Sequence, residues 1–384
     1  MVKELLTGNY AIAEAVRLSR VQLVAAYPVT PQTPIYERLS EWESQGKLGG
    51  LMMRMESEHS SMAACISASL TGVRVFAATS SQGLAFMHEM LHFASGNRVP
   101  VVMACVNRAL AVPWAFGSDQ TDTLSQRDTG WMQFYCEGNQ EALDTVIQAY
   151  KVSEQVLLPS MVIIDGFFTS HFIEPVEIPE QSSVDQFLPK CQIPQRFDAK
   201  DPGFAASVVD ASQYFQFRQR SFEDMEKAKT VIKDVDEEYG KAFGRGYGLI
   251  EAVDVQDAEV VLVTSGAITS TARVALESLR KKGYSVGLLK IKTFRPFPTE
   301  EVQEVLQGVS KVAVVDRNIS IGKEGIFCHE LRAALYPLDS RPIIFGYIAG
   351  LGGTDVSPEI LEGIVMDTLH RDKPEDSPVW IRGD

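Results

Sequence analysis

Apolar residues follow two different periods along the first 170 residues of the chain. Short runs rich in Val, Ile, Ala and Met are typical of strands buried inside a parallel sheet. Such runs predict strands at Val21–Ala26, Leu51–Met55, Val73–Ala78, Val99–Val106 and Met161–Asp165. Between them, apolar residues three or four positions apart predict helices at Asn9–Leu18, Gln32–Trp42, Glu58–Leu70, Gly83–Ala94 and Asn139–Val156. This alternation predicts a parallel sheet with helices on both faces.

The alternation stops between residues 172 and 250 and then resumes. The interrupting segment holds an extended stretch (EPVEIPEQ), a loop (QRFDAKDPGF) and a charged helix predicted at Ala211–Phe243. The strands predicted after it are Glu259–Thr264, Ser285–Ile291, Lys311–Val315 and Pro342–Tyr347. The helices predicted after it lie near Ser270–Lys281, Thr299–Leu306, Ile326–Leu335 and Pro358–Leu369. The expected fold is therefore α/β, with two doubly wound domains at residues 1–180 and 251–384, joined by a linker at 181–250 that carries the charged helix.

Composition and charge narrow the classes of function. The chain has 384 residues, of which 45% are hydrophobic and 22% charged, as expected for a globular protein of two or three domains. Its net charge of −14 argues against nucleic acid or an anionic membrane surface as a partner. No apolar run approaches the length of a membrane span, and the N-terminus lacks a signal-peptide pattern. We therefore expect a cytoplasmic protein that does not associate with membranes.

The cysteines and histidines form no metal-ligand pattern. The five cysteines are Cys65, Cys105, Cys136, Cys191 and Cys328. No two of them form a C-x-x-C pair and most lie in apolar runs, so we expect buried thiols in a reducing compartment rather than disulfides or a cluster. The six histidines show no H-E-x-x-H spacing, and we expect no metal site on this chain.

The stretch that leaves the first strand, YPVTP at residues 27–31, is stiff. Proline fixes its own φ and restricts the residue before it, so Pro28 and Pro31 restrict the backbone around Thr30. A rigid turn that starts the next helix, with Pro31 near its first turn, explains the pattern without any ligand. Ligands of open parallel sheets bind outside the carboxyl ends of the strands, so Thr30 is also a candidate site residue.

Two further segments follow strands at the same edge of the sheet. MRMESEHSS places Glu56 and Glu58 at a strand-to-helix junction, where a carboxylate also stabilises the helix N-terminus. ATSSQGL is a small polar turn whose hydroxyl groups suit either a helix cap or a ligand. Nucleotide binding has little support, because neither G-x-G-x-x-G nor a P-loop motif occurs.

The segment VNRALAVPWAFGSDQTD carries the most specific chemistry. Arg108 directly follows a buried strand, where its guanidinium group suits either a substrate carboxylate or a salt bridge to a nearby aspartate. Trp114 and Phe116 lie in a loop with Pro and Gly, where large rings either fold back on the core or line a pocket. For Asp119 and Asp122, turn or capping roles are favoured over metal ligation.

These motifs occur together in an order and spacing that is known from one family. They are YPVTP, SEHSS, SSQGL, NRAL, SDQTD and QRDTGW, then EALDTVIQAYKVSE, DGFFTSH, FGRGYGLIE and GYIAGLGGTDV. With this set, which spans nearly the whole chain, the sequence resembles the α subunit of the 2-oxoacid:ferredoxin oxidoreductases, and most of all that of pyruvate:ferredoxin oxidoreductase (pyruvate synthase). The resemblance implies an N-terminal domain of the thiamine pyrimidine-binding type and a smaller C-terminal domain like that of transketolase, whose role in the family is subunit contact.

The resemblance also implies an activity and roles for single residues. The activity is the reversible, coenzyme A-dependent oxidative decarboxylation of pyruvate on thiamine pyrophosphate, with electrons passed to ferredoxin. Glu58 matches the glutamate that hydrogen-bonds the pyrimidine ring nitrogen and favours the imino tautomer. Thr30 matches a residue whose hydroxyl contacts the substrate, and Arg108 matches the arginine that binds the substrate carboxylate. The other candidates for cofactor binding lie in the same segments: Pro28, Ser81 and Gln82.

The resemblance further implies that the chain is active only in a complex. No G-D-G-type diphosphate motif occurs here, so a β subunit would hold the diphosphate with its Mg²⁺ and a [4Fe–4S] cluster. Further subunits, γ and a ferredoxin-like δ or fused equivalents, would bring more clusters and contacts to coenzyme A. Thiamine would then lie at the interface between this chain and the β subunit.

The identity of the 2-oxoacid remains open at this stage. The loop AVPWAFGSD is not the sequence expected in the commonest pyruvate enzymes. We predict pyruvate first, because Trp114 and Phe116 would narrow the space beside Arg108. The alternatives are another substrate of the same family (a branched-chain 2-oxoacid, 2-oxoglutarate or oxalate) or a non-catalytic assembly subunit. Intact Glu58 and Arg108 argue against a non-catalytic subunit.

Overall fold

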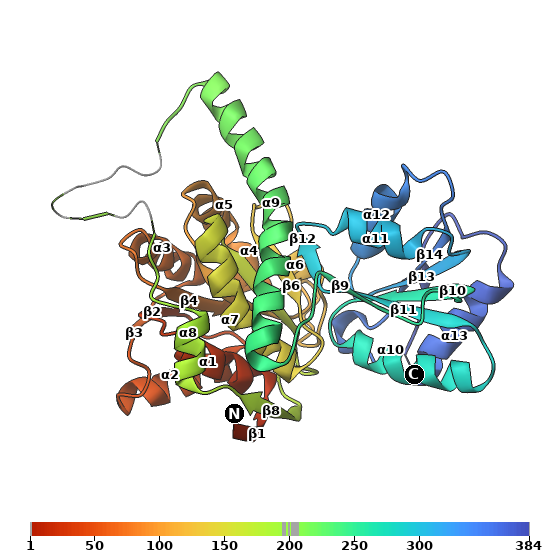
Figure 1. Cartoon of the computed structure of the whole chain (residues 1–384), viewed down its shortest axis with the longest axis horizontal. Coiled ribbons are helices and arrows are strands. Elements are labelled where there is room, and N and C mark those ends of the chain that lie inside the picture. Colours follow the sequence, from red (N-terminus) through yellow and green to blue (C-terminus); the bar gives the residue numbers. More distant parts are fainter. Residues whose placement is uncertain (1, 194–196, 199, 201–206, 384) are drawn as a thin grey trace.

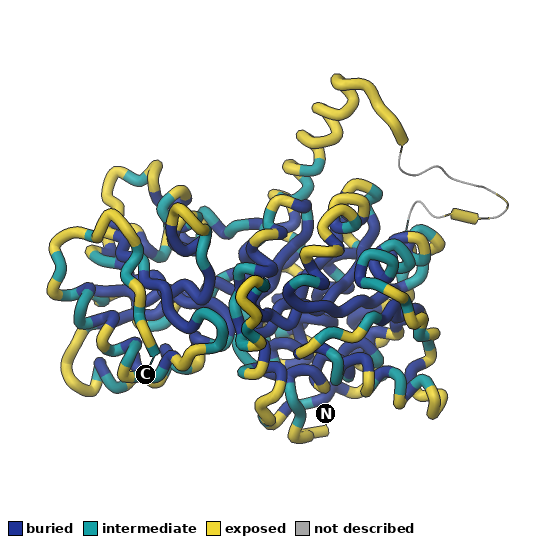
Figure 2. The backbone as a smooth tube through the Cα atoms, turned by 180° about the vertical axis from the view of Figure 1, so that it is seen from behind, coloured by how far each residue is buried: buried dark blue, intermediate teal, exposed yellow. Residues whose placement is uncertain are grey.

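Two α/β units, each built around its own sheet, make up the molecule (Figure 1). The computed structural model describes residues 2–193, 197–198, 200 and 207–383. Both units are doubly wound, so the predicted fold class is confirmed. Buried residues lie in the interior of both units, and exposed residues lie mostly at their periphery (Figure 2). Within the described ranges, no helix is long and apolar enough to cross a membrane.

The first sheet has seven strands in the order β12-β6-β7-β5-β4-β2-β3. Their bounds are β2 Leu23–Ala26, β3 Leu51–Arg54, β4 Val75–Thr79, β5 Val102–Asn107, β6 Met132–Tyr135, β7 Ser160–Asp165 and β12 Thr293–Arg295. All of them pair in parallel except β12, which runs antiparallel to β6. The second block of the sequence therefore supplies one short strand to the first sheet.

Alternate residues of these strands face opposite helical layers, as the period of two in a strand requires. On β5, Ala104 packs in one apolar cluster and Met103 in the other. The helices on the first face are α1 Gly8–Leu18, α2 Thr33–Ser44, α7 Asn139–Val156, α8 Gln181–Phe187 and the lower part of α9 Ala211–Phe243. Those on the second face are α3 Glu58–Ser69, α4 Ser81–Phe86 and α5 His88–Gly96. The predicted helix Gly83–Ala94 is thus two helices that meet at Met87.

The second sheet has six strands in the order β15-β14-β13-β10-β11-β9. Their bounds are β9 Ile250–Val253, β10 Val260–Thr264, β11 Val286–Ile291, β13 Lys311–Asp316, β14 Ile343–Ile348 and β15 Val379–Trp380. Its helices are α10 Ile268–Lys281, α11 Thr299–Leu306, α12 Ile326–Leu335 and α13 Pro358–His370. One apolar cluster continues from the first unit into the second, where Tyr135 lies edge-on to Phe294 and Phe327.

Several strands escaped prediction from the sequence. They are β1 Val2–Thr7, β6, β9, β12 and β15. β1 pairs antiparallel with β8 Ile173–Ile178, which contains most of the stretch predicted to be extended. Val2–Thr7 mixes charged and apolar residues and is largely exposed, so it lacks the signal of a buried strand.

The charged helix α9 has the predicted bounds, Ala211–Phe243. Asp210 and Gln213 form a capping box at its start, and Gly244 at φ +77° ends it. Its lower half packs on α7, where Asp144 accepts hydrogen bonds from Tyr239 and from Arg245. Its upper part extends beyond the body (Figure 1). The predicted loop at residues 195–204 lies mostly outside the described residues.

Candidate active site

Neighbouring strands bring the predicted site residues to one edge of the first sheet. Thr30 follows β2, Gln82 follows β4 and Arg108 follows β5. Glu58 is the first residue of α3, after β3. Since the strands are parallel, their carboxyl ends share this edge, which is where ligands bind in open α/β sheets.

Arg108 joins two of the other segments. Its side chain is buried, with 4% of the residue exposed, and Nη1 donates to the carbonyl oxygen of Thr30 at 2.7 Å. Nη2 donates to Oε1 of Gln82 at 3.0 Å, and Nε is buried with no hydrogen-bond partner among the described residues. The rings of Trp114 and Phe116 lie 5.8 and 5.6 Å from the guanidinium carbon.

The guanidinium group of Arg108 makes no ion pair with any carboxylate in the described part of the chain. Two of its five N–H groups are donated to protein oxygens, which leaves three. Burial lowers the pKa of Arg108, and the carboxylates of Asp122 and Glu58 oppose that decrease. Since neither carboxylate is within ion-pair distance, the remaining N–H groups suit a further carboxylate.

Glu58 is a second charged group without an ion-pair partner in the described part of the chain. Ser57 caps helix α3 by accepting the N–H of Ser60, so the cap does not use the Glu58 carboxylate. Glu58 is 8% exposed and makes no hydrogen bond or ion pair with any residue that the structure describes. Its carboxylate lies over Gly83, where an added Cβ would stand 2.4 Å from Oε1. The nearby Thr79 hydroxyl is also buried, and no residue in the described ranges is its hydrogen-bond partner.

The buried carboxylate of Asp122 fixes the loops that carry the candidates. It accepts the backbone N–H of Ser81 at 2.9 Å and that of Arg108 at 3.1 Å. It also accepts from Nδ2 of Asn107 at 2.5 Å. Burial raises the pKa of Asp122 to about 7, while these donors favour its charged form. Asp122 therefore does more than the predicted turn or capping role, because its carboxylate fixes two loops at once. The sequence does not show this.

Ser81 has an unusual backbone. Its φ of +51° lies in the left-handed region, which costs a non-glycine residue about 1–2 kcal/mol. The hydroxyl of Ser81 donates to the carbonyl of Ala109 at 2.7 Å and lies 2.6 Å from Oε1 of Gln82. These bonds turn Gln82 towards Arg108. The sequence offers no signal for this conformation.

The exit of β2 has contacts that differ from the simple turn expected. Asn9 of α1 donates from Nδ2 to the carbonyl of Pro31 at 3.0 Å and holds the loop in place, a role that sequence reasoning missed. The first turn of α2 contains Pro34, not Pro31, because the helix begins at Thr33. The Thr30 side chain is exposed, and only its carbonyl contacts Arg108. Pro28 is exposed beside it and joins none of the hydrogen bonds that link the other candidates.

The second unit braces the loop after β5. Asp165, at the end of β7, accepts the backbone N–H of Ala267 at 2.8 Å and pairs with Arg317 at 3.3 Å. The SGAITSTA turn therefore packs against the first unit. Gly117 lies so close to the second unit that an added Cβ would stand 2.0 Å from the carbonyl oxygen of Gly352. The loop that holds Trp114 and Phe116 is thus positioned by both units.

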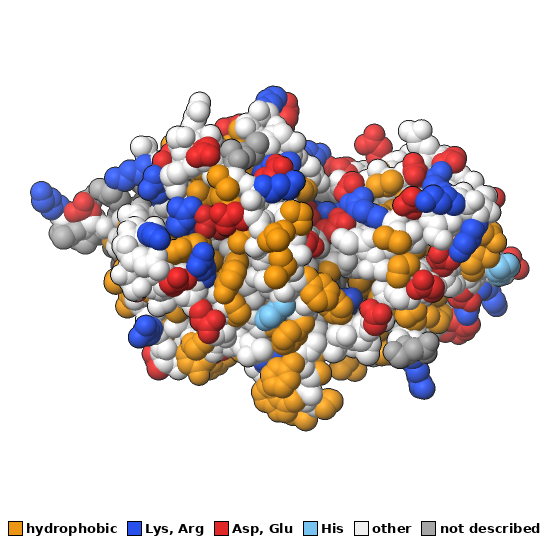
Figure 3. All heavy atoms as spheres, turned by 90° about the horizontal axis from the view of Figure 1, so that it is seen from below, with side chains coloured by type: hydrophobic (Ala, Val, Ile, Leu, Met, Phe, Trp, Pro, Cys, Tyr) orange, Lys and Arg blue, Asp and Glu red, His pale blue; other side chains and the backbone are white. Residues whose placement is uncertain are grey.

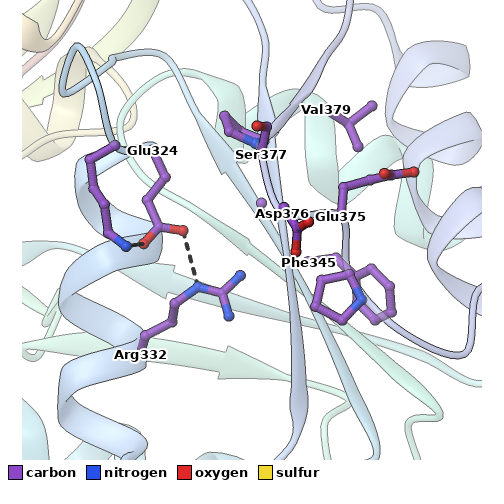
Figure 4. A pocket seen from close by; sticks show the side chains of 11 residues that line it. Glu324, Arg332, Phe345, Glu375, Asp376, Ser377 and Val379 are labelled. Carbon is purple, nitrogen blue, oxygen red and sulfur yellow. Dashed lines mark hydrogen bonds and ion pairs between the residues drawn. The ribbon is translucent and has the colours of Figure 1, made fainter.

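Other parts of the described chain offer weaker sites. No group of three or more His, Cys, Asp or Glu side chains in the described ranges could hold a metal ion. Four cysteines are buried as predicted, while Cys191 is half-buried. A pocket of about 230 Å³ in the second unit holds Arg332, but this cation is already paired with Glu324 at 3.1 Å (Figure 4).

Comparison with known proteins identifies the family. Residues 14–237 match the model of pyruvate flavodoxin/ferredoxin oxidoreductase, thiamine diphosphate-binding, and residues 258–361 match core domain II of pyruvate:ferredoxin oxidoreductase. The chain belongs to the 2-oxoacid:ferredoxin oxidoreductase family. This is a family of oxidoreductases, as predicted from the motifs.

Two curated relatives of this oxidoreductase chain cover nearly its full length. The ketoisovalerate oxidoreductase subunit VorA of Pyrococcus abyssi is 49% identical over 95% of this chain and 93% of its own length. The pyruvate synthase subunit PorA of Methanothermobacter thermautotrophicus is 45% identical over 99% of this chain and 98% of its own length. Both relatives are named as subunits.

Two solved structures share the fold of this oxidoreductase chain. The 2-oxoglutarate:ferredoxin oxidoreductase of Magnetococcus marinus has a TM-score of 0.74 at 19% identity, and the match covers 96% of this chain and 65% of that longer chain. A split gene transketolase has a TM-score of 0.55 at 13% identity, with 95% of this chain and 98% of that chain covered.

The candidate site of this oxidoreductase fits the thiamine diphosphate that its family model names. An aminopyrimidine ring offers a nitrogen to a carboxylate and an amino group to hydroxyl and carbonyl oxygens. Glu58 and Thr79 supply a carboxylate and a hydroxyl that lie near the same point of Gly83 and that no other described side chain occupies. Gly83 lets both side chains lie against its backbone, because a Cβ at this position would stand 2.4 Å from Oε1 of Glu58 and 2.6 Å from Oγ1 of Thr79.

Proposed function

We propose that the chain is the α subunit of an enzyme that oxidatively and reversibly decarboxylates pyruvate with coenzyme A and passes electrons to ferredoxin. The observation that carries the proposal is a pair of charges at one strand edge, the Glu58 carboxylate and the Arg108 guanidinium, neither of which has an ion-pair partner among the residues that the structure describes. A site for a 2-oxoacid on thiamine needs one anion for the cofactor and one cation for the substrate. The family match supports the same conclusion.

Each candidate residue has a defined task in this proposal. Arg108 binds the substrate carboxylate with its remaining N–H groups and holds the acid in one orientation. The Thr30 hydroxyl contacts the 2-oxo group, since the carbonyl of the same residue is already tied to Arg108. Glu58 exchanges a proton with the pyrimidine nitrogen of the cofactor. Bound thiamine supplies the electron sink for decarboxylation.

The remaining cofactor contacts come from the same two loops. Gln82 accepts a hydrogen bond from Arg108 and Ser81 precedes it, so both would line the cofactor, and the hydroxyl of Ser81 contacts Oε1 of Gln82. Pro28 would contribute an exposed apolar surface at the exit of β2. Asp122 would act only through the loops that it fixes.

A β subunit that covers this edge completes the site. The side of the molecule where β1 and the N-terminus lie shows many hydrophobic side chains (Figure 3). Large apolar residues near the site are exposed, among them Val112, Trp114, Phe116 and Phe172. Exposed apolar surface of this kind marks an interface. The β subunit would hold the diphosphate, its Mg²⁺ and a [4Fe–4S] cluster, with γ and ferredoxin-like δ subunits or fused equivalents beyond it.

The substrate is proposed from the loop after β5. Trp114 and Phe116 lie against Arg108 and leave little width beside a bound carboxylate, which favours pyruvate. The similarity to VorA supports 2-oxoisovalerate as the second candidate. One methylene group changes the binding free energy by only roughly 1–3 kcal/mol in such a pocket, so we expect graded rather than absolute discrimination. The free cysteines suit a reducing cytoplasm.

The proposal is tested on the native complex. The complex is purified, its subunits are identified, and coenzyme A-dependent dye reduction is measured with a panel of 2-oxoacids. We expect thiamine-dependent activity with the highest kcat/KM for pyruvate. A higher kcat/KM for 2-oxoisovalerate overturns the choice of substrate, and absence of activity with every 2-oxoacid overturns the function.

A further inference from the structure

The upper part of α9 is a second exposed apolar feature, far from the strand edge that carries the site. We call residues 211–222 the α9 tip. The tip extends beyond the body (Figure 1) and its backbone is exposed (Figure 2). Four aromatic side chains on it are between 38% and 69% exposed: Tyr214, Phe215, Phe217 and Phe222. Four exposed aromatic residues within nine positions are unusual for a surface that stays in water.

Two of the four aromatic side chains, Tyr214 and Phe217, continue the packing face of the helix. Lower on α9, the buried residues Ala228, Ile232, Val235 and Tyr239 follow the spacing of one helix face. The same spacing of three or four residues, continued from Ala228 towards the N-terminus of α9, leads to Ser221 and Phe217 and then to Tyr214. The face that packs on the body below therefore continues above the body with nothing from the described chain to cover it.

A groove lies at the base of the tip. It is a cavity of about 410 Å³ between α9 and the body, and its apolar lining includes Leu158, Phe217, Phe222, Met225 and Phe297. This volume is sufficient for one or two large apolar side chains. The groove and the tip form one continuous surface, since Phe217 and Phe222 belong to both.

The groove lining has mixed charge, with Arg127, Arg218 and Arg295 beside Asp128, Glu226 and Glu330, so the charge of the tip itself indicates what covers it. The tip carries Arg218 and Arg220 and no acidic residue, in a chain of net charge −14. Neither arginine makes an ion pair with the described residues, and Arg127 at the groove donates only to a backbone carbonyl. A second copy of this chain is disfavoured, because a two-fold pairing of the tips would bring arginines against arginines.

We propose that the α9 tip and its groove dock another subunit of the complex, one that presents apolar side chains within an acidic rim. The aromatic residues supply the buried centre of the contact, and the arginines pair with the rim. The proposal rests on the multi-subunit enzyme proposed above. The proposed contact lies at the end of the sheet opposite to the strand edge that carries the thiamine site.

The experiment compares variants within the co-expressed complex by native mass spectrometry. One variant is Tyr214→Ser/Phe215→Ser and another is Arg218→Glu/Arg220→Glu. The controls are Tyr336→Ser and Lys47→Glu/Lys373→Glu, which change exposed residues elsewhere. We expect both tip variants to lose the same subunit, because the Kd between this chain and that subunit rises at least tenfold. The melting temperature of the isolated chain should not change. The control variants should keep the subunit.

The other outcomes separate this proposal from the proposed function. If both tip variants keep every subunit, or if the wild-type chain purifies alone, the docking proposal is wrong. The docking proposal is also wrong if the tip variants only separate two copies of this chain and every other subunit stays bound. A wild-type complex without thiamine-dependent activity overturns the proposed function but leaves the result at the tip standing.

Discussion

Replacing Gly83 by alanine tests whether the position of the Glu58 carboxylate decides turnover. A methyl group at this position would stand 2.4 Å from Oε1 of Glu58 and 2.6 Å from Oγ1 of Thr79. Neither atom belongs to the backbone, so both side chains can turn away. The carboxylate would then move away from the position beside the pyrimidine ring that the proposal gives it.

The effect on stability should be small. Gly83 lies within helix α4, where alanine is favoured over glycine by about 1 kcal/mol. Overpacking in a tight site costs about 1–3 kcal/mol, so the free energy of unfolding should fall by no more than about 2 kcal/mol. Turnover should fall by about two orders of magnitude, because displacing a reacting group by about 1 Å costs that much.

The assay is dye reduction by the complex, with the melting temperature measured on the same samples. Gly363→Ala in α13 is the matched control, because a Cβ at that position meets no atom within 4 Å. We expect it to keep full turnover. If Gly83→Ala folds normally and turns over at the wild-type rate, the position of the Glu58 carboxylate does not limit the reaction and the assignment is wrong.

Three further predictions concern Arg108, Asp122 and the junction of the two units. Arg108→Lys loses the planar guanidinium group, so it should raise the KM for the 2-oxoacid about tenfold or more and leave the KM for coenzyme A unchanged. A fall in melting temperature without a change in KM would mean that Arg108 has only a structural role. Asp122→Asn turns an NH₂ group towards the N–H groups of Ser81 and Arg108. It should lower the free energy of unfolding by about 1–3 kcal/mol and raise the KM for the 2-oxoacid. An unchanged KM would contradict the positioning role of Asp122. Burial opposes ionisation of Glu137, but Arg273 and Lys290 hold the pKa of its carboxyl group at about 2. The ionised carboxylate therefore stabilises the folded state above pH 4.5, and this contribution is lost as the pH falls towards 2. Glu137→Gln should therefore lower the free energy of unfolding by roughly 2–3 kcal/mol at pH 7, and a difference that stays constant down to pH 2 would contradict the ion pair.

The sequence predicted the elements that have a strong local signal. Asn139–Val156 and Ala211–Phe243 are helices with the predicted bounds, because both have long apolar periods and α9 also has a capping box. β12 gave no such signal, since its three residues become a strand only by pairing with β6, about 160 positions earlier. β1 escaped because it is exposed and its partner β8 is far along the chain.

The candidate site could be predicted only as far as the motifs reach. The sequence indicated which residues stand at the strand ends, and Arg108, Thr30 and Gln82 do lie in direct contact. The left-handed backbone of Ser81 and the buried bonds of Asp122 depend on contacts across 14 to 41 positions, so no local pattern shows them. The same holds for Asn9, whose bond to Pro31 spans 22 positions.

The central claim is that the Glu58 carboxylate activates thiamine from this chain, and Glu58→Gln in the assembled complex tests it most directly. Glutamine keeps the size of the side chain but cannot exchange the proton. We expect intact assembly, thiamine affinity within a few-fold of the wild type, and a kcat lower by about two to four orders of magnitude. A kcat close to that of the wild type, with the cofactor fully bound, would contradict the account.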